Sequence, residues 1–211
     1  QPHGFSLYEM QNGEFRVFVI NHAQQKHSID IFALKSGKLD LVRSVESDLF
    51  LSPNDVVAVG PEQFYISNDH GAESSFMRKL EDYLKLPLSN AVYFDGNKAK
   101  EVATGMSYAN GINVSKDGKT LFLNSVTSLI LYVYQRDLIT NELTLIKEIN
   151  TGTGIDNIEL DEAGDLWIGS HPQMLKFVGH AKSADNFSPS QVIKVKASDG
   201  SYDIEEVYLN D

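Results

Sequence analysis

A strand–turn–strand pattern recurs along the chain and constrains the fold more than any other feature of the sequence. Each copy starts with a polar residue, continues as a short strand and a turn, and ends in a strand of apolar and aromatic residues; the copies occupy residues 54–67, 110–124 and 157–169. His3-Gly4-Phe5 followed by residues 15–21 is a looser fourth copy. Starting points roughly 50 residues apart, slightly above the period of a four-stranded blade, predict an all-β fold, a β-propeller with inserted loops.

Short apolar segments between turn residues support this interpretation. The expected strands cover residues 16–21, 28–34, 55–59, 63–67, 91–94, 120–124 and 129–134. Asn12-Gly13, Ser36-Gly37, Asp117-Gly118 and Ala163-Gly164 are the turn signals between strands. The last residues, 191–210, resemble the beginning of another blade, so about four to five blades are expected. We therefore interpret residues 1–211 as a single propeller domain, whose remaining strands come from another segment or chain.

One insertion, within residues 75–86, has the periodicity of a short amphipathic helix. Phe76, Leu80, Tyr83 and Leu84 recur at the spacing of one helical face. The simplest role of such a helix is to cap the propeller. Its basic neighbours, which are Arg78, Lys79 and Lys85, would also suit peripheral contact with a membrane or lipoprotein surface.

Charge and composition exclude several classes of function. Eighteen Lys and Arg residues against 29 Asp and Glu residues give a formal charge of -11, which would repel a nucleic-acid backbone. The absence of cysteine excludes thiolate metal sites and cysteine nucleophiles. No Gly-x-Ser-x-Gly motif of a serine hydrolase occurs either. A cation or a small neutral substrate is the expected partner.

Polar residues at the start of each repeat are candidate metal ligands. The innermost strands of a propeller run along its axis, so these residues gather at one end of the channel: His3, Asn54, Asn110 and the pair Asp156-Asn157. Amide and carboxylate oxygens are the ligands that Ca²⁺ prefers, about 6–8 at a time. Asp55 points the opposite way along its strand and could serve a second, deeper cation. The alternative is that each Asn caps a turn at a strand entrance.

Histidines at the other ends of the same hairpins, together with His3, are candidate bases. Four of the six histidines cluster at this rim in the propeller interpretation: His3, His22, His70 and His171. A neutral imidazole near pH 7 can take a proton from water. A single loop histidine is more often a hydrogen-bonded structural residue, but His3 and His22 belong to one hairpin and could touch.

These residues together resemble the serum paraoxonase and arylesterase family of calcium-dependent lactonases. The resemblance rests on Pro2-His3-Gly4, Val-Ile-Asn-His at 19–22, the segment 54–70, Ala-Asn-Gly-Ile-Asn at 109–113, Asp156-Asn157 and Gly-Asp-Leu-Trp-Ile-Gly-Ser-His-Pro at 164–172. It covers nearly the whole chain in the same order. A more distant similarity connects the architecture to gluconolactonase-like and strictosidine-synthase-like propellers.

The resemblance implies a six-bladed propeller with two calcium ions in its central tunnel. It assigns Asn54, Asn110, Asp156 and Asn157 to the catalytic calcium, and Asp55 with the main-chain carbonyl of Phe5 to the structural one. His3 and His22 match the histidine dyad of the family, His171 is an alternative base, and Asp69, His70 and Tyr108 match pocket positions. The sequence departs from the family pattern at several points: no acidic stretch precedes the His-Gly motif, the final strands and the cysteines of the terminal disulfide have no counterpart, and Ser170 stands where a cysteine is common.

The expected function is therefore a calcium-dependent hydrolase that opens lactones. Acyl homoserine lactones, the substrates of quorum quenching, or other lipophilic lactones are the expected substrates, with promiscuous arylesterase and phosphotriesterase activity. A gluconolactonase-like enzyme for sugar lactones and a non-enzymatic, calcium-stabilised scaffold are the alternatives. Because such calcium sites fill readily where calcium is millimolar, a secreted or periplasmic location is expected.

Overall fold

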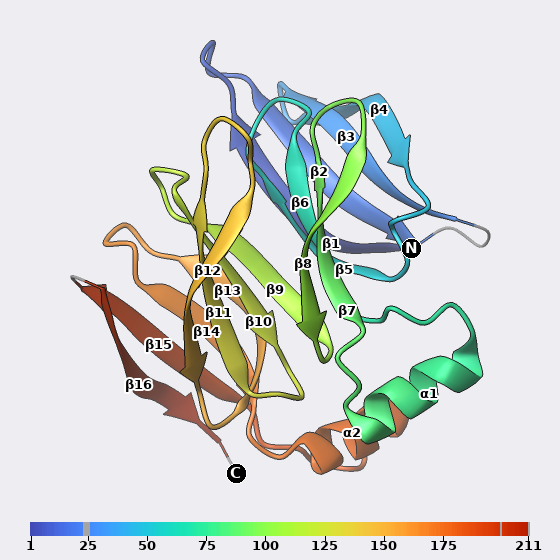
Figure 1. Cartoon of the computed structure of the whole chain (residues 1–211), viewed down its shortest axis with the longest axis vertical. Helices are drawn as coiled ribbons and strands as arrows, with labels where there is room; N and C mark the ends of the chain where they lie inside the picture. Colours follow the sequence, from blue (N-terminus) through green and yellow to red (C-terminus); the bar gives the residue numbers. More distant parts are fainter. Residues whose placement is uncertain (23–25, 199, 211) are drawn as a thin grey trace.

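The computed structural model describes residues 1–22, 26–198 and 200–210, whose strands form four antiparallel sheets of four strands each (Figure 1). The first two sheets contain β1 (Pro2–Glu9), β2 (Phe15–His22), β3 (His27–Lys35), β4 (Lys38–Glu46), β5 (Pro53–Ala58), β6 (Phe64–Asn68), β7 (Ser89–Phe94) and β8 (Ala99–Met106). The other two contain β9 (Ala109–Val114), β10 (Thr120–Ser125), β11 (Ile130–Arg136), β12 (Leu143–Asn150), β13 (Gly154–Leu160), β14 (Leu166–His171), β15 (Gln191–Ser198) and β16 (Ser201–Leu209). Helices α1 (Ser75–Leu84) and α2 (Met174–Lys182) follow the second strand of the second and fourth sheets.

The first strand of each sheet contacts the first strand of the next. β1 lies against β5, β5 against β9, and β9 against β13. Because the four strands of each sheet lie in chain order, these inner strands surround a common axis and the later strands lie progressively outward. This is a propeller-like all-β arrangement, as the repeat predicts.

The core consists of three apolar clusters, one between each pair of successive sheets. Phe18 of the first sheet packs on Phe64 of the second, and Phe64 stacks on Phe94 at 5.1 Å between ring centroids. The second cluster joins the second and third sheets through Tyr65 and Leu123, and the third joins the last two sheets. Each fully buried side chain of this size contributes about 1.5–3 kcal/mol, so the sheet-to-sheet contacts fix the arrangement of the inner strands.

The expected strands and the helix near residues 75–86 are confirmed, whereas the start of another blade at 191–210 is wrong. β15 pairs with β14 and β16 pairs with β15, so these residues complete the fourth sheet. The insertion that holds α2 separates β14 from β15 in sequence, which makes the last two strands look like a new pair. The part of the chain that the structure describes contains four sheets, and the number six stays a prediction from the resemblance.

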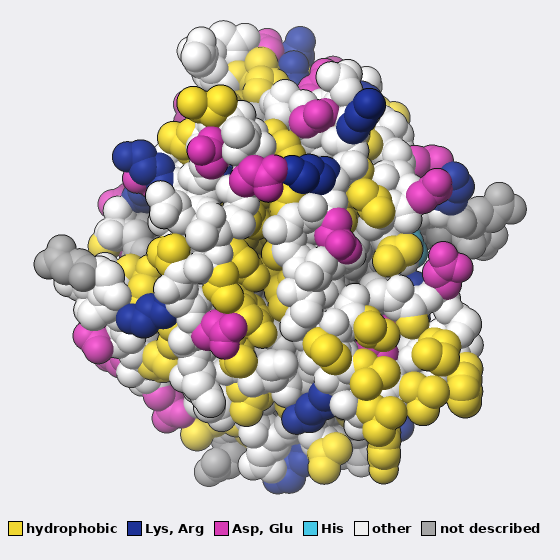
Figure 2. Space-filling view, in the orientation of Figure 1, with side chains coloured by type: hydrophobic (Ala, Val, Ile, Leu, Met, Phe, Trp, Pro, Cys, Tyr) yellow, Lys and Arg dark blue, Asp and Glu magenta, His cyan; other side chains and the backbone are white. Residues whose placement is uncertain are grey.

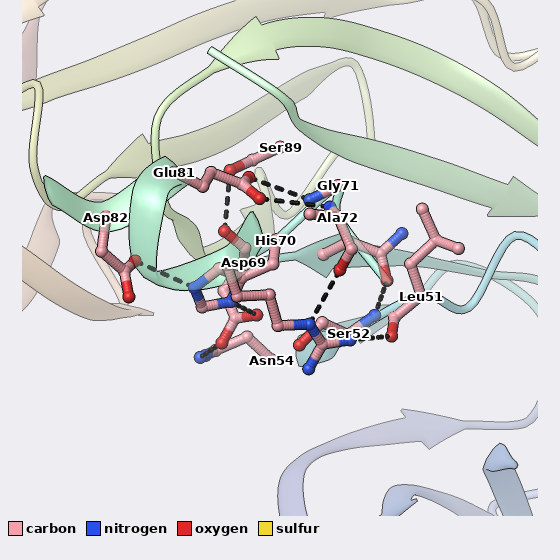
Figure 3. Close-up of polar contacts among 12 residues, drawn as sticks. Leu51, Ser52, Asn54, Asp69, His70, Gly71, Ala72, Glu81, Asp82 and Ser89 are labelled. Carbon is pink, nitrogen blue, oxygen red and sulfur yellow. Dashed lines mark hydrogen bonds and ion pairs between the residues drawn. The ribbon is translucent and has the colours of Figure 1, made fainter. Parts of the chain in front are cut away.

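Helix α1 presents its polar side to the protein and its apolar side to solvent. Glu81 is its buried residue, and its carboxylate accepts hydrogen bonds from the backbone N–H groups of Gly71 (2.9 Å) and Ala72 (3.1 Å) (Figure 3). Phe76 and Tyr83, from the stripe that predicts the helix, are 68% and 88% exposed. Polar contacts rather than this stripe therefore attach the helix, and its role as a cap of the propeller stays a prediction.

Both helices lie at one end of the molecule (Figure 1). A broad apolar area covers the corresponding corner of the surface in Figure 2. Its exposed side chains on or beside the helices are Phe76, Met77, Tyr83, Leu84, Leu88, Leu175, Val178 and Phe187. No helix in the described residues is long and apolar enough to cross a membrane.

Candidate functional site

Each inner strand carries one register shift against its partner, and the shift falls on the polar residues that the repeat predicts. Pairing steps from Pro2 to Phe5 in β1, from Pro53 to Asp55 in β5, from Ala109 to Ile112 in β9 and from Ile155 to Ile158 in β13. A β-bulge of this kind leaves an extra residue unpaired and redirects its side chain. The polar residues inside the four shifts, called the bulge residues below, are His3, Asn54, Asn110, Asp156 and Asn157.

Two glycines let the inner strands approach each other at the bulge residues. A methyl group added at Gly4 would lie 2.8 Å from the Oδ1 atom of Asp55. One added at Gly111 would lie 2.5 Å from the carbonyl oxygen of Asp156. These distances are too short for any side chain, so glycine is required for β1 to meet β5 and for β9 to meet β13 at this level.

A cavity of about 320 Å³ lies among β1, β5 and β13. Its lining residues are His3, Gly4, Phe5, Asp55, Asn157 and Glu159. The structure thus brings together four residues that the sequence assigns to the site, while the side chain of Phe5 is 66% exposed. Sequence reasoning missed Glu159, although it lies two residues after Asn157 and therefore on the same face of the strand.

Asp55 is a buried carboxylate in this cavity, with 8% of its surface exposed. Its oxygens accept backbone hydrogen bonds from Val56 (2.9 Å) and Ile112 (3.0 Å). Burial, with smaller contributions from the charges of Glu159 and Asp156, still raises the pKa of Asp55 to about 7. The cavity is electronegative, which favours a cation.

The bulge residues fit calcium by their donor chemistry. The carboxamide oxygen of Asn110 is buried and accepts no hydrogen bond from the described residues. An unpaired buried oxygen costs about 1–3 kcal/mol. Asn54 donates its amide hydrogen to Asp69 (3.2 Å), so its oxygen is the atom left for a cation. Hard oxygen donors of this kind suit Ca²⁺.

Carboxylates and imidazoles alone would not complete such a site. Within the described ranges, no three His, Asp or Glu side chains converge on one point as a metal cage. Any cation here therefore depends on amide and main-chain oxygens as well.

His171 lies beside the bulge of β13 and connects it to α2. Its Nε2 atom is 2.9 Å from Oδ2 of Asp156, and its ring stacks on Phe177 at 3.7 Å between centroids. His171 also lines a second pocket of about 240 Å³, shared with Lys85 at the end of α1 and Met174 at the start of α2. The predicted base histidines therefore do not share one cavity, because His3 lines the first pocket and His171 the second.

His3 and His22 are neighbours, as their shared hairpin predicts. Their rings meet edge to face with 5.2 Å between centroids. His22 also contacts a third histidine, His27, which lies directly opposite it in the β2–β3 hairpin. Burial, followed by the proximity of His27 and His3, lowers the pKa of His22 to about 4, so this ring is neutral at pH 7. Sequence reasoning did not assign His27, although it lies only five positions after His22 in the sequence.

Asp69 and His70 form a hydrogen-bonded link between the site and α1 (Figure 3). His70 bonds Asp69 through Nδ1 (2.7 Å) and Asp82 of α1 through Nε2 (2.9 Å). Burial opposes protonation of His70, but its contacts with the two carboxylates outweigh burial and raise its pKa above the usual range. Tyr108 packs edge-on against His70 at 5.2 Å, which brings all three predicted pocket residues to one side of the bulge at Asn54.

Arg78 is part of the attachment of α1. It donates from Nε to the carbonyl oxygen of Ala72 (2.8 Å) and from its guanidinium to that of Leu51 (3.0 Å). The guanidinium is committed to these carbonyl groups, so the expected lipid-facing basic group is reduced to Lys79 and Lys85.

Comparison with known proteins identifies related sequences over almost the whole chain. The sequence model of the family described as Arylesterase matches residues 1–211. Serum paraoxonase/arylesterase 2 of Rattus norvegicus is 34% identical over 216 residues, covering 99% of this chain and 59% of that protein. The protein of the same name from Gallus gallus is 36% identical over 198 residues, covering 92% of this chain and 55% of that protein. The chain therefore spans somewhat more than half the length of these relatives.

Solved structures share the architecture at low sequence identity. The periplasmic gluconolactonase of Pseudomonas aeruginosa matches with a TM-score of 0.55 at 14% identity, over 97% of this chain and 56% of that one. The calcium-binding protein regucalcin from Agrobacterium tumefaciens matches with a TM-score of 0.55 at 15% identity, over 95% of this chain and 72% of that one. These similarities establish the propeller-like fold.

Proposed function

The chain belongs to the arylesterase family, and from this premise we propose that it is a calcium-dependent hydrolase that opens lactone rings and, more weakly, cleaves aryl esters. The observation that carries the proposal is the meeting of His3, Asp55 and Asn157 in one electronegative cavity, beside the unpaired buried oxygen of Asn110. Such a cavity suits a divalent cation next to an imidazole, which is the minimum needed to activate a carbonyl group and a water molecule.

Two groups of oxygens are assigned to two calcium ions. Asn54, Asn110, Asp156 and Asn157 would hold the catalytic ion. Asp55, with the main-chain carbonyl group of Phe5, would hold the deeper one. When bound, the catalytic ion supplies Lewis-acid stabilisation to the substrate carbonyl oxygen as negative charge develops there.

The protein's own side chains provide the proton chemistry. His22 is neutral at pH 7 and can accept the proton of an attacking water, with His3 packed against its ring. His171 is the weaker candidate for the base, because its Nε2 atom is already bonded to Asp156. In this assignment His171 orients a metal ligand, which is a common role for hydrogen-bonded groups around metal sites.

The surface near the site favours lipophilic lactones. Exposed apolar side chains lie on both helices, which His70 and His171 contact, and a polyhydroxylated ring would gain little from them. The alternative is a sugar-lactone hydrolase, and the fold shared with a gluconolactonase supports it.

The same apolar area supports peripheral contact with a lipid surface. A helix attached through Glu81 and Arg78 while Phe76 and Tyr83 face solvent has the orientation of an interfacial helix. With calcium as its cofactor, the protein would work in a compartment rich in that ion, either secreted or periplasmic.

A substrate panel separates these possibilities. The measurement is kcat/KM at saturating calcium for a long-chain acyl homoserine lactone, gluconolactone and phenyl acetate. The proposal predicts the order lipophilic lactone, then aryl ester, then sugar lactone. A preference for gluconolactone would favour the sugar-lactone alternative, and no turnover by a folded, calcium-loaded protein would favour a binding scaffold.

A further inference from the structure

His27 makes a direct hydrogen bond to His22. The two Nδ1 atoms are 2.9 Å apart, and the rings are perpendicular with 4.8 Å between centroids. A hydrogen bond between two imidazole nitrogens needs one protonated and one unprotonated atom. The bond therefore couples the tautomers of the two rings: the ring that donates from Nδ1 keeps its Nε2 atom free of hydrogen.

Both rings are neutral near pH 7. The pKa of His22 falls to about 4, first because of burial. Burial also lowers the pKa of His27. The charged and titratable groups that face the pair are the N-terminal ammonium group, His3, Arg78 and Asp69. His22 is affected by both His3 and the N-terminus, so it is the less basic ring. The less basic imidazole is the better N–H donor, and His27 is therefore the better acceptor.

We propose that His27 is a positioning residue, which accepts a hydrogen bond from Nδ1–H of His22 and thereby holds Nε2 of His22 as a free proton acceptor. Free histidine prefers the opposite tautomer, with the hydrogen on Nε2, in which Nε2 of His22 could not accept a proton. Within the described residues, Nε2 of His22 has no hydrogen-bond partner, and its ring packs against His3, which lines the cavity.

The consequence for the reaction rests on the proposed function. Water loses one proton to Nε2 of His22, and the electron pair of the broken O–H bond forms the new C–O bond to the lactone carbonyl carbon. At the same time the C=O π pair moves onto the carbonyl oxygen, and it later re-forms the C=O bond as the ring C–O bond breaks. The imidazolium that results keeps its Nδ1–H bond to neutral His27. It then gives the proton from Nε2 to the ring oxygen as the lactone C–O bond breaks. His27 thus orients His22 as the aspartate of a Ser-His-Asp triad orients its histidine, although His27 is neutral and the aspartate is negatively charged.

The tautomer can be measured without any turnover. Long-range ¹H–¹⁵N correlation spectra at pH 7.5 distinguish protonated from unprotonated imidazole nitrogens, and the His22→Gln protein assigns the His22 signals. Wild-type His22 should be protonated at Nδ1 and bare at Nε2. In His27→Leu, His22 should change to the Nε2-protonated tautomer. Wild-type His22 protonated at Nε2 would overturn the proposal and leave the proposed hydrolase function standing.

Kinetics supply the second readout. His27→Leu should lower kcat on a lactone by about 10²-fold, the lower end of what a general base contributes, with KM nearly unchanged. His27→Asn, which keeps a neutral acceptor, should recover much of the loss. In His27→Asp a carboxylate would stabilise the His22 imidazolium, so the acid limb of the pH–rate profile should move to higher pH.

A distant histidine provides the matched control. His180→Leu on α2 removes a ring that bonds only Asn186 in the described structure, and it should change neither the tautomer nor kcat. A folded His27→Leu protein with wild-type kcat and an unmoved acid limb would contradict the positioning role.

Discussion

The Nε2 atom of His171 lies 2.9 Å from the carboxylate of Asp156, and this bond connects the end of β14 to the bulge of β13. The ring is held from its other side by stacking on Phe177 of α2. An inserted helix therefore fixes the orientation of a candidate calcium ligand, although it contributes no ligand itself.

Removal of this bond should weaken calcium binding. We expect His171→Ala to raise the calcium Kd by about 10–100-fold, the usual effect of losing a group that orients a metal ligand. Isothermal titration calorimetry on calcium-depleted protein measures the change. His180→Ala on α2 is the control and should bind calcium as the wild type does. An unaltered Kd in His171→Ala would remove His171 from the support of the site.

Replacing Asn110, whose side-chain oxygen is unpaired, should affect the Tm differently with and without calcium. Asn110→Leu replaces a buried unsatisfied group by an apolar one of similar shape, so the calcium-free Tm should stay equal or rise. The increase in Tm that calcium gives the wild type should disappear. Thermal melts in EDTA and in calcium test both parts.

A second asparagine on the same strand serves as the control for this experiment. Asn113 donates to the carbonyl oxygen of Ile158 (2.7 Å), so Asn113→Ala should lose about 1 kcal/mol of stability in either condition. If Asn110→Leu still gained the wild-type calcium shift, the oxygen would not be a ligand.

Gly111→Ala should destabilise the fold. The new methyl group would lie 2.5 Å from the carbonyl oxygen of Asp156, and overpacking of this kind costs about 1–3 kcal/mol. Gly169→Ala on β14 is the matched change, because no atom lies within 4 Å of its added methyl group. Urea unfolding should show a loss for Gly111→Ala and no loss for Gly169→Ala. Equal stabilities would show that β9 and β13 do not need their close approach.

The attachment of α1 should weaken as pH rises. The folded pKa of His70 is raised above its ordinary value of 6.5, so its ion pairs with Asp69 and Asp82 contribute fully below that value. They are lost as pH rises through the folded pKa. Amide hydrogen exchange in α1, corrected for intrinsic rates, should therefore be slower at pH 5.5 than at pH 8.5. His70→Gln should lack this difference, and a wild-type helix with pH-independent protection would contradict the link.

The repeat in the sequence predicts the sheets because hydrophobic alternation and turn residues are local signals. It also predicts which residues open the inner strands: His3, Asn54 and Asn110 each take the second position of their strand. The bulges are what redirect these residues, and they arise from pairing with a neighbouring strand, which no local pattern contains. The prediction that residues 191–210 begin a new blade is wrong for a related reason, because α2 separates β14 from β15 in the sequence although the two strands pair.

Contacts between distant segments account for the rest of what the sequence did not predict. The apolar stripe of α1 correctly indicates a helix, but its orientation depends on Glu81 and Arg78 meeting the backbone of the preceding loop and strand entry. The role of His27 depends on a strand register that places it opposite His22. Both features depend on tertiary contacts, which the periodicity of a single segment does not predict.

Calcium dependence of lactone hydrolysis tests the central claim most directly. Ring opening of a long-chain acyl homoserine lactone is followed in a pH-stat with calcium, after EDTA, and after calcium is restored. Turnover that is lost with EDTA and returns with calcium is the predicted result. Turnover that survives complete removal of calcium, or its absence from a folded protein with bound calcium, would contradict a calcium-dependent lactonase.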